Sequence, residues 1–187
     1  MGFRGSAVYA GGNAEIGDSQ MATTLKLGVL TLSDSGARGE RVDTSGPAIV
    51  EVLSPFSPEI VEKAIIPDDP EKIRQTLRAW AQSGRMNLIV TTGGTGLGPR
   101  DVTPEATRDV IDREVPGLAE LMRAEGLKHT PMASIGRGIA GLAGRTLILN
   151  VPGSEKAARQ NLQAVLPVLE HALDLIAGDT DRHPVSE

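Results

Sequence analysis

The sequence predicts an α/β protein built in three layers, a mostly parallel sheet with helices on both faces. Short apolar runs rich in strand formers alternate along the chain with segments whose apolar residues recur at helical spacing. Such alternation is typical of strand–helix–strand units, which form parallel sheets. The 187 residues suit one compact domain with a full core, and we expect that domain to span residues 25–178.

Four apolar runs are predicted to be the strands of this sheet. The run at residues 87–92, NLIVTT, is apolar enough to be buried on both faces, as the strands of parallel sheets are. The run at residues 25–32 ends at a polar Ser-Asp-Ser sequence, which is typical of the end of a strand. The other two predicted strands are residues 59–66 and 146–151.

The segments between and after these runs are predicted to be helices. Thr44 or Ser45 is expected to cap the first helix. Leu121 is expected on an apolar helix face, and Pro167 is expected to kink the last helix. Residues 132–143 are rich in small side chains and fit no single element. Beyond the first, the predicted helices are residues 71–82, 104 to about 114, about 117–126, and 155–176.

Composition argues against several classes of function. Aromatic residues make up 2% of the chain and the formal net charge is -5, so no nucleic-acid partner is expected. The chain has no cysteine, which excludes disulfides and thiolate chemistry. The three histidines, His129, His171 and His183, are scattered in sequence and are expected to be solvated or structural.

Neither end of the chain is predicted to belong to the folded domain. No run of about 18 apolar residues occurs, so no membrane span is expected. The first 20 residues are Gly-rich and lack the apolar core of a signal peptide, and a cytoplasmic protein is expected. Residues 1–24 and 179–187 are predicted to be loose tails, with Met21 as an alternative start.

A polar loop follows each predicted strand. If the strands are parallel, these loops share one edge of the sheet, where α/β proteins bind their ligands. Several independent segments then contribute to one pocket, which makes the prediction stronger than any single motif. The loops are residues 33–45, 67–70, 92–103 and 150–154.

The loop after the third predicted strand has the composition of an anion site. Its GGTG sequence, residues 93–96, lets backbone N–H groups approach a ligand, and such groups form an anion-binding nest. Arg100 can hold phosphate oxygens with its fork of N–H donors. Asp101 and Asp68 suit a phosphate site if a magnesium ion lies between them and the phosphates. These residues predict a site for a nucleotide or another phosphorylated ligand, with Mg²⁺.

Each of these features also has a plain structural explanation. A GGTG sequence occurs in simple turns, and Arg100 can form a surface ion pair with Asp101. Asp68 and Ser154 are both placed to cap a helix. No lysine follows the glycines, so the Walker phosphate-binding pattern is absent. The pattern G-x-G-x-x-G occurs at residues 136–141, but a strand is predicted after it, which argues against a dinucleotide site.

The ordered motifs of this chain resemble the molybdopterin adenylyltransferases, the MogA/MoaB-like family of molybdenum cofactor biosynthesis. The motifs are LTLSDSG, DTSGP, TTGGTGLGPRDVTPEAT and LILNVPGS, and the resemblance covers roughly residues 26–178. It implies the molybdenum-cofactor biosynthesis fold. It also implies adenylylation of molybdopterin by ATP, with Mg²⁺ and with release of pyrophosphate. A non-catalytic molybdopterin-binding or scaffold protein of the same fold is the alternative.

The resemblance further implies roles for individual residues. Asp68 and Asp101 are the expected catalytic residues and Mg²⁺ ligands. Gly136 stands where several relatives have a serine that is expected near the pterin, and Ser134 is the nearby residue that could replace its hydroxyl. Arg137 is expected to bind the pterin. A homotrimer is expected, with a downstream molybdenum-insertion protein as partner. The expected substrate-binding residues are Ser33, Asp34, Asp43, Ser45, Gly46, Thr92, Gly93, Gly94, Thr95, Gly96, Arg100, Arg137, Asn150, Pro152, Gly153 and Ser154.

Overall fold

A computed structural model describes residues 23–179, and its strands form one six-stranded sheet in the order β2-β1-β3-β6-β5-β4. β2, β1, β3 and β6 pair in parallel, and β5 and β4 continue the sheet in antiparallel pairing. Met21 and nearly all of both predicted tails lie outside the described residues. The strands are β1 (Lys26–Leu32), β2 (Glu59–Ile66), β3 (Leu88–Thr92), β4 (Arg113–Glu114), β5 (Ala140–Ala143) and β6 (Thr146–Val151).

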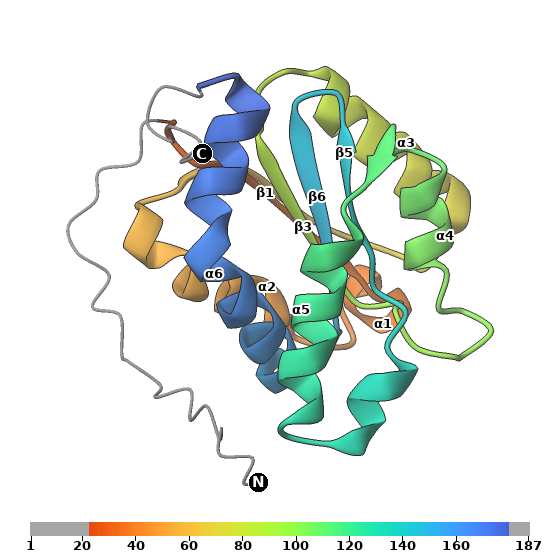
Figure 1. Cartoon of the computed structure of the whole chain (residues 1–187). Coiled ribbons are helices and arrows are strands. Elements are labelled where there is room, and N and C mark those ends of the chain that lie inside the picture. The colour runs from red at the N-terminus through yellow and green to blue at the C-terminus, as the bar shows by residue number, and fades with distance from the viewer. Residues whose placement is uncertain (1–22, 180–187) are drawn as a thin grey trace, which may run out of the picture.

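Helices cover both faces of the sheet, which confirms the predicted three layers (Figure 1). α2, α5 and α6 pack on one face, where their apolar side chains form one buried cluster with β1 and β3. α3 and α4 pack on the opposite face in a second cluster. The helices are α1 (Asp34–Ala37), α2 (Ser45–Val52), α3 (Pro70–Gln82), α4 (Thr103–Arg108), α5 (Pro116–Leu127) and α6 (Glu155–Ala177), with 3-10 turns η1 (Ser54–Phe56) and η2 (Pro131–Ile135).

The central strand β3 shows why both faces must be covered. All five of its residues are buried. Because successive side chains of a strand point to opposite faces, Leu88 and Val90 join one cluster and Ile89 joins the other. Burying each such aliphatic side chain contributes about 1.5–3 kcal/mol relative to leaving it exposed. The continuous apolar run in the sequence is therefore the signature of this two-sided burial.

The structure corrects two predictions about the elements and assigns a segment that the sequence left open. The helix expected to reach residue 114 ends at Arg108, because the chain beyond it pairs with β5 as strand β4. The segment 132–143, which fitted no single element, contains most of η2 and the whole of β5. Leu121, expected on an apolar helix face, is 38% exposed. In the first two cases, strand pairing between distant segments decided the structure.

The cap of α2 also differs from the prediction. Thr44 makes no capping hydrogen bond with its side chain, and Ser45 is the first helical residue. The carboxylate of Asp43 is the cap, since its Oδ1 accepts the N–H groups of Ser45 at 3.1 Å and Gly46 at 2.9 Å. A negative charge at this end of a helix is favourable, because the helix dipole places its positive end there.

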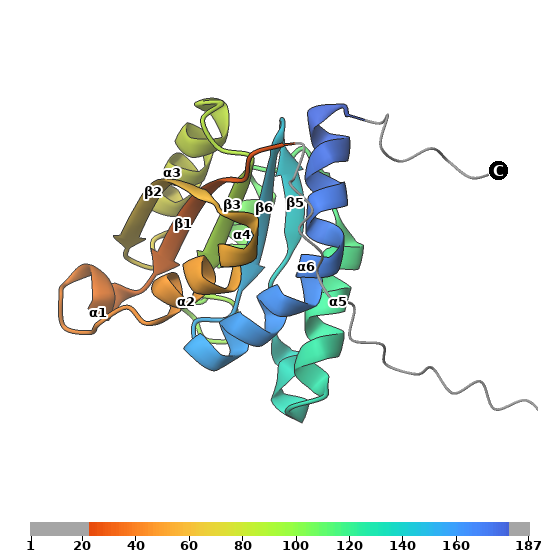
Figure 2. The same ribbon diagram turned by 90° about the vertical axis from the view of Figure 1, so that its left-hand side faces the viewer.

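The longest helix, α6, contains Pro167, and Figure 2 shows it changing direction along its length, as predicted. Proline removes one helical hydrogen bond and its ring displaces the preceding turn, which accounts for the bend. None of the helices in the described part of the chain is long and apolar enough to cross a membrane.

The strand order places a crevice at one edge of the sheet. β1 lies between β2 and β3, so the connections from β1 to β2 and from β2 to β3 run in opposite directions across the sheet. In such sheets a crevice opens beyond the carboxyl ends of the strands at this point. The segments that follow β1 and β3 border it at the same end of the sheet (Figure 1).

Candidate ligand site at the carboxyl edge of the sheet

Two cavities meet at this edge of the sheet. The larger, which we call the apolar cavity, has a volume of about 480 Å³ and lies among the glycine loop, α5, η2 and α6. The smaller, the polar cavity, has a volume of about 370 Å³ and lies among the loops that follow β1, β2 and β3. Gly94, Asp101, Gly153 and Ser154 line both, so they form the wall between the cavities.

The glycine loop in this wall requires glycine at its first two positions. Gly93 and Gly94 have φ angles of 101° and 60°, a region that other residues rarely adopt. A Cβ on Gly93 would lie 2.3 Å from the Leu32 carbonyl oxygen, and one on Gly94 would lie 2.4 Å from Thr103 Oγ1. Glycine is therefore needed here both for the backbone conformation and for the close approach of the neighbouring chain.

The same loop keeps free backbone donors. The Gly93 N–H donates to the Val151 carbonyl oxygen at 3.3 Å, which ties the loop to the end of β6. Within residues 23–179, no group accepts a hydrogen bond from the N–H groups of Gly94, Thr95 or Gly96. Successive free N–H groups in a glycine turn are the features of an anion-binding nest. The structure thus supports the interpretation of the loop as an anion site rather than only a turn.

Asp34 and Asp68 bind each other's backbone at the ends of β1 and β2. The Asp34 N–H donates to Asp68 Oδ2 at 3.0 Å, and the Asp68 N–H donates to Asp34 Oδ1 at 3.1 Å. Arg100 donates from Nε and Nη2 to the two Asp34 oxygens, at 3.1 and 2.9 Å. Arg100 therefore pairs with Asp34 rather than with Asp101, and the cap of α3 is Asp69 rather than Asp68.

The environment of Asp68 disfavours its negative charge. Partial burial raises the pKa of this carboxyl above its ordinary value of 3.8, and the nearby carboxylates of Asp34 and Asp101 add to the increase. The Asp34 N–H and the charge of Arg100 act in the opposite direction. In contrast, the hydrogen bonds from Arg100 lower the pKa of Asp34. A cation next to Asp68 would remove much of the cost of its charge.

Asp68 and Asp101 each keep one carboxylate oxygen available for a cation. Asp68 Oδ2 accepts the Asp34 N–H, and Asp101 Oδ2 accepts the Gly98 N–H at 2.7 Å. Neither Oδ1 accepts a hydrogen bond from the described chain. No group of three His, Cys, Asp or Glu residues among residues 23–179 could hold a metal ion. Two carboxylates suit Mg²⁺ when substrate phosphates complete its shell, so these residues fit an ion that arrives with a phosphorylated ligand.

Arg137 lies behind the glycine loop rather than in a cavity. Its Nε donates to the Gly96 carbonyl oxygen and its Nη2 to the Asp101 carbonyl oxygen, both at 2.6 Å. Nη1 binds the Glu105 carboxylate, and the Arg137 N–H donates to the Thr95 carbonyl oxygen at 2.9 Å. Arg137 lines neither cavity. The structure shows Arg137 holding both ends of the segment that carries Asp101, and its role in binding the pterin stays a prediction.

Asn150 lines the apolar cavity, but its amide is bound within the protein. Nδ2 donates to Thr91 Oγ1 at 2.9 Å and to Thr107 Oγ1 at 3.0 Å. Oδ1 accepts the Ile139 N–H at 3.4 Å. This buried network joins β3, β6 and α4, so Asn150 supports the cavity wall with hydrogen bonds that a ligand would have to replace.

Several predicted site residues also stabilise the start of a helix. Ser33 Oγ accepts the Gly36 N–H at 3.0 Å at the beginning of α1. Thr31 Oγ1 donates to the capping residue Asp43 at 2.7 Å. Ser154 caps α6, as predicted, because its side chain accepts the third N–H of that helix. The N-terminus of α6, with the positive end of its dipole, therefore opens onto both cavities.

Most of the predicted substrate-binding residues line at least one cavity. Asp34, Gly46 and Arg137 line neither, although Asp34 and Arg137 bind residues that do. The predicted residues of the polar cavity are Ser33, Asp43, Ser45, Asp68, Thr92, Gly93, Gly94, Arg100, Asp101, Gly153 and Ser154. The apolar cavity adds Thr95, Gly96, Asn150 and Pro152.

The position of the replaced serine lies in the wall of the apolar cavity. Gly136 lines this cavity, and a Cβ there would lie 3.2 Å from the Ala133 carbonyl oxygen. Ser134 does not take over its place, because it is exposed, lies outside both cavities and donates to the Pro131 carbonyl oxygen at 2.8 Å. The wall at Gly136 is therefore backbone alone.

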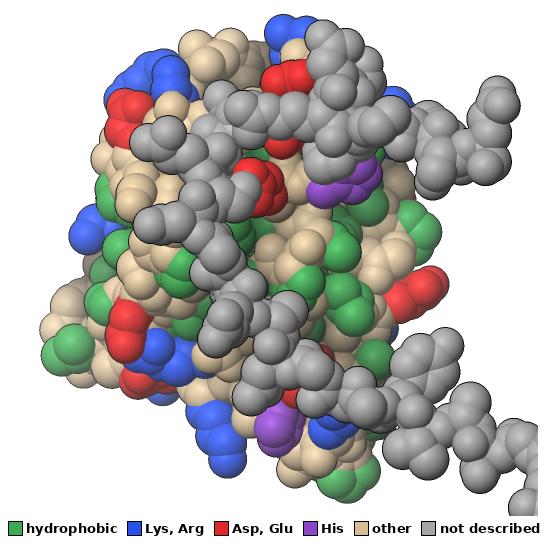
Figure 3. All heavy atoms as spheres, turned by 60° about the vertical axis from the view of Figure 1, so that its left-hand side comes forward, with side chains coloured by type: hydrophobic (Ala, Val, Ile, Leu, Met, Phe, Trp, Pro, Cys, Tyr) green, Lys and Arg blue, Asp and Glu red, His purple; other side chains and the backbone are tan. Residues whose placement is uncertain are grey.

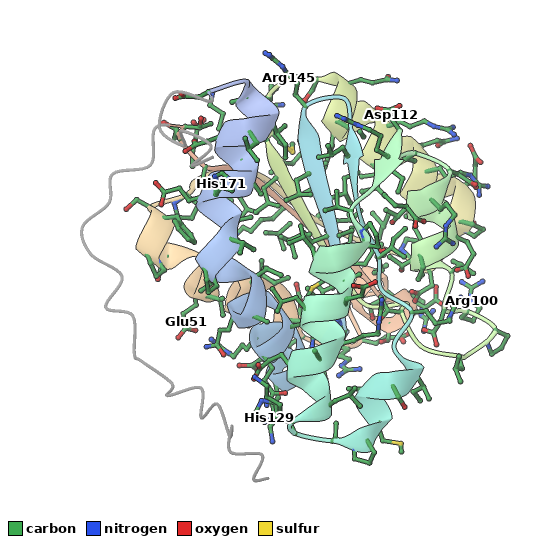
Figure 4. All side chains as sticks on the ribbon, in the orientation of Figure 1. Glu51, Arg100, Asp112, His129, Arg145 and His171 are labelled. Carbon is green, nitrogen blue, oxygen red and sulfur yellow. The ribbon has the colours of Figure 1, made fainter. Side chains whose placement is uncertain are left out.

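The two described histidines lie apart from each other and from the cavities. Figure 4 places His171 on α6 and His129 beyond the end of α5, and Figure 3 shows the histidine side chains at separate places on one face. Neither lines a cavity, and His129 Nε2 lies 3.2 Å from a carboxylate oxygen of Glu125. His183 lies outside the described residues.

Reasoning from the sequence missed several polar side chains of the cavity walls. Arg41 lines the polar cavity, and Arg123 and Asn161 line the apolar cavity. A signal for Asn161 was available. It occupies a core-facing position of α6, three residues after Ala158 and four before Val165, where apolar side chains are the rule.

The sheet, its crevice and the two cavities define an α/β protein that holds its ligands beyond the carboxyl ends of parallel strands. Residues 28–171 match the family model described as a probable molybdopterin binding domain. The chain belongs to this family, as its motifs predicted.

Three relatives show how far the likeness extends. The molybdopterin adenylyltransferase of Helicobacter pylori strain J99 is 41% identical, over 83% of this chain and 90% of that protein. Molybdenum cofactor synthesis protein cinnamon of Drosophila melanogaster is 43% identical over 83% of this chain, but the match spans only 26% of that longer protein. The crystal structure of the molybdopterin biosynthesis enzyme MoaB from Thermus thermophilus is 58% identical, covers 83% of this chain and 98% of its own, and has a TM-score of 0.79.

Proposed function

We propose that this protein is a molybdopterin adenylyltransferase, which joins the AMP part of ATP to molybdopterin and releases pyrophosphate in molybdenum cofactor biosynthesis. The observation that carries the proposal is the wall that the two cavities share at Gly94, Asp101, Gly153 and Ser154. Substrates in the two cavities would meet at this wall, as a transfer between them requires. The name of the Helicobacter pylori relative supports the proposal.

The residues around the wall suit this reaction. An oxygen of molybdopterin attacks the α-phosphorus of ATP, and the bond to the bridging oxygen breaks as pyrophosphate leaves. Such a transfer depends on positioning and on neutralising charge, and it needs no protein nucleophile. The free N–H groups of residues 94–96 hold phosphate oxygens, and Arg100 adds a positive charge at the mouth of the polar cavity.

Mg²⁺ is the metal that we propose for this site. When bound, it supplies positive charge that reduces the repulsion between the phosphates and the attacking oxygen. Asp68 and Asp101 would hold it through the carboxylate oxygens that accept no hydrogen bond from the described chain. The raised pKa of Asp68 supports this assignment, because a cation keeps that carboxyl ionised.

The test is incubation of the purified protein with molybdopterin, ATP and Mg²⁺, followed by mass detection of adenylylated molybdopterin. We expect product that disappears with a chelator and with Asp101→Asn. A folded protein that binds molybdopterin but forms no product would instead support the alternative, a non-catalytic molybdopterin-binding or scaffold protein.

We also propose a homotrimer and transfer of the product to a molybdenum-insertion protein. The trimer is supported by the family resemblance, and the transfer by the occurrence of this domain within the longer cinnamon protein. Sedimentation at micromolar concentration is expected to give the trimer mass, and a monomer would contradict it. A cytoplasmic location stays a prediction.

A further inference from the structure

Two polar side chains in the wall of the apolar cavity, the Thr95 hydroxyl and the Asn161 amide, have no hydrogen-bond partner in the described chain. Asn161 is 9% exposed, and its amide bonds to nothing in residues 23–179. The other amide of this wall, Asn150, is 1% exposed and bonded at both its nitrogen and its oxygen. Buried polar groups are nearly always bonded, so an unbonded amide that faces a cavity points to a group that binds there.

The surroundings of Asn161 do not supply that partner. Ala119 and Met122 of α5 and Ala157 of α6 contribute apolar surface to the same cavity. Arg123 is also in this wall, and its Nη1 donates to the Gly138 carbonyl oxygen at 2.9 Å. A largely apolar cavity with few uncommitted polar groups suits a flat ring with apolar faces and a polar edge.

We infer that Asn161 is a specificity-determining residue that hydrogen-bonds the aminopyrimidine edge of the substrate ring in the apolar cavity. A side-chain amide presents a donor beside an acceptor. An aminopyrimidine presents the complementary pair, a ring nitrogen that accepts beside an amino group that donates, and Asn makes a comparable two-bond contact with N7 and the amino group of adenine. Pterin and adenine both carry this edge, so the inference rests on the proposed function and leaves open which of its two substrates is bound here.

The experiment is calorimetric titration of the folded protein with free pterin and, separately, with AMP. The variants are Asn161→Leu, which keeps the size but removes the polar atoms, and Asn161→Ser as a second substitution in case the first unfolds. Gln163→Leu is the matched control, because it removes an amide from an exposed position of the same helix. Thermal unfolding of each variant establishes that it is folded.

We expect Asn161→Leu to weaken binding of one ring by about tenfold or more, the effect of losing two hydrogen bonds in a site that excludes water. Binding of the other ring is expected to stay within about twofold. In the full reaction, KM for the affected substrate rises while kcat is largely kept, since the lost contact is equal in the ground and transition states. Gln163→Leu is expected to change neither.

Unchanged binding of both rings would overturn the inference, and so would an equal loss of both, because that is the result of a collapsed cavity. Product formation by the unaltered protein separates this inference from the proposed function. If the unaltered protein forms product while the folded Asn161→Leu variant binds both rings normally, the inference fails and the function stands. If the unaltered protein forms no product but the Asn161→Leu variant loses binding of one ring, the inference stands and the proposed function fails.

Discussion

The two cavities of this protein differ in how their polar groups are used. Around the polar cavity, charged groups bind one another: Asp34, just behind its wall, exchanges backbone hydrogen bonds with Asp68, and Arg100 donates to Asp34. In the apolar cavity, the amide of Asn161 is left without a partner in the described chain. The polar cavity is thus organised for charge before any ligand arrives, whereas the apolar cavity keeps a free side-chain amide for recognition.

The origin of the two cavities differs as well. The polar cavity is made of loops that follow β1, β2, β3 and β6, so its residues come at or after strand ends in the sequence. Much of the wall of the apolar cavity comes from α5, η2 and α6, which join it only through the folding of the helical layer. The charged residues are therefore positioned by the strand ends, whereas the residues proposed to recognise the ring are positioned by helix packing.

Replacing Gly94 is expected to have the largest effect, because this residue belongs to both cavities. A Cβ there would lie 2.4 Å from Thr103 Oγ1 and 3.1 Å from Asp68 Oδ1. Gly94→Val is expected to abolish binding of both pterin and ATP–Mg²⁺, measured by calorimetric titration. The strain costs on the order of 1–3 kcal/mol, which a domain of ordinary stability survives.

Gly144→Val is the matched control for this prediction. Gly144 has a φ of 59°, nearly that of Gly94, but a Cβ there would meet nothing within 4 Å and it lines neither main cavity. The Gly144→Val variant has the same backbone strain as Gly94→Val but should bind both ligands normally. Normal binding of both ligands by Gly94→Val would show that the glycine loop is only a turn.

Removing a carboxylate is expected to affect turnover far more than binding in the apolar cavity. Asp68→Asn and Asp101→Asn should each lower kcat by roughly 100-fold or more, the size of effect found when one group that stabilises transition-state charge is lost. Binding of the ring in the apolar cavity should persist, and stability should change by under about 1 kcal/mol. Steady-state kinetics measures kcat, and thermal unfolding measures the change in stability.

The neighbouring Asp69→Asn serves as the control for the carboxylates, because Asp69 caps α3 and lines neither cavity. Its turnover should stay near normal, since asparagine also caps helices. A near-normal rate in Asp68→Asn or Asp101→Asn would remove that residue from the proposed reaction.

Arg137→Lys tests whether the wall between the cavities must be held in place. Lysine keeps the charge but cannot bridge the carbonyls of Gly96 and Asp101 and the Glu105 carboxylate together. We expect turnover to fall roughly tenfold to 100-fold from misplacement of Asp101. Hydrogen exchange of the loop amides should become faster at the same time.

Arg108→Lys is the control, because Arg108 forms a surface ion pair with Glu114, and this variant should change neither turnover nor hydrogen exchange. A normal rate in Arg137→Lys would show that the loop keeps its position without this arginine.

The smallest expected effect is a pH dependence that arises from Asp68. Its pKa in the folded protein is raised, so the carboxylate needed for Mg²⁺ is lost at a higher pH than for an ordinary aspartate, and turnover should fall there as the pH is lowered. The free energy of unfolding depends on pH in the opposite direction. The folded protein binds this proton more tightly than the unfolded chain, so stability is lost as the pH rises from 3.8 through the raised pKa. Asp68→Asn should remove this part of the dependence in unfolding measured at several pH values, and an unchanged curve would contradict it.

The sequence alone was enough for the features that depend on local patterns. Apolar runs identified β1, β2, β3 and β6, and the family resemblance and the alternation with helices predicted the layers. Because parallel strands end at one edge, the sequence places Asp68, Arg100 and Asp101 in one pocket, and all three line the polar cavity. The glycine requirement of the GGTG loop also follows from residue chemistry.

Only the tertiary structure decided which of these groups bind one another. Arg100 and Asp34 are 66 residues apart, and Arg137 and Gly96 are 41 apart, so no local pattern predicts their hydrogen bonds. The pairing of β4 with β5 ended a predicted helix early, because strand hydrogen bonds from a distant segment outweighed local helix propensity. The place of Asn161 in a cavity depended on how α6 packs against α5. Local physics determines where elements and loops form, whereas long-range packing determines which polar groups are satisfied within the protein and which remain for a ligand.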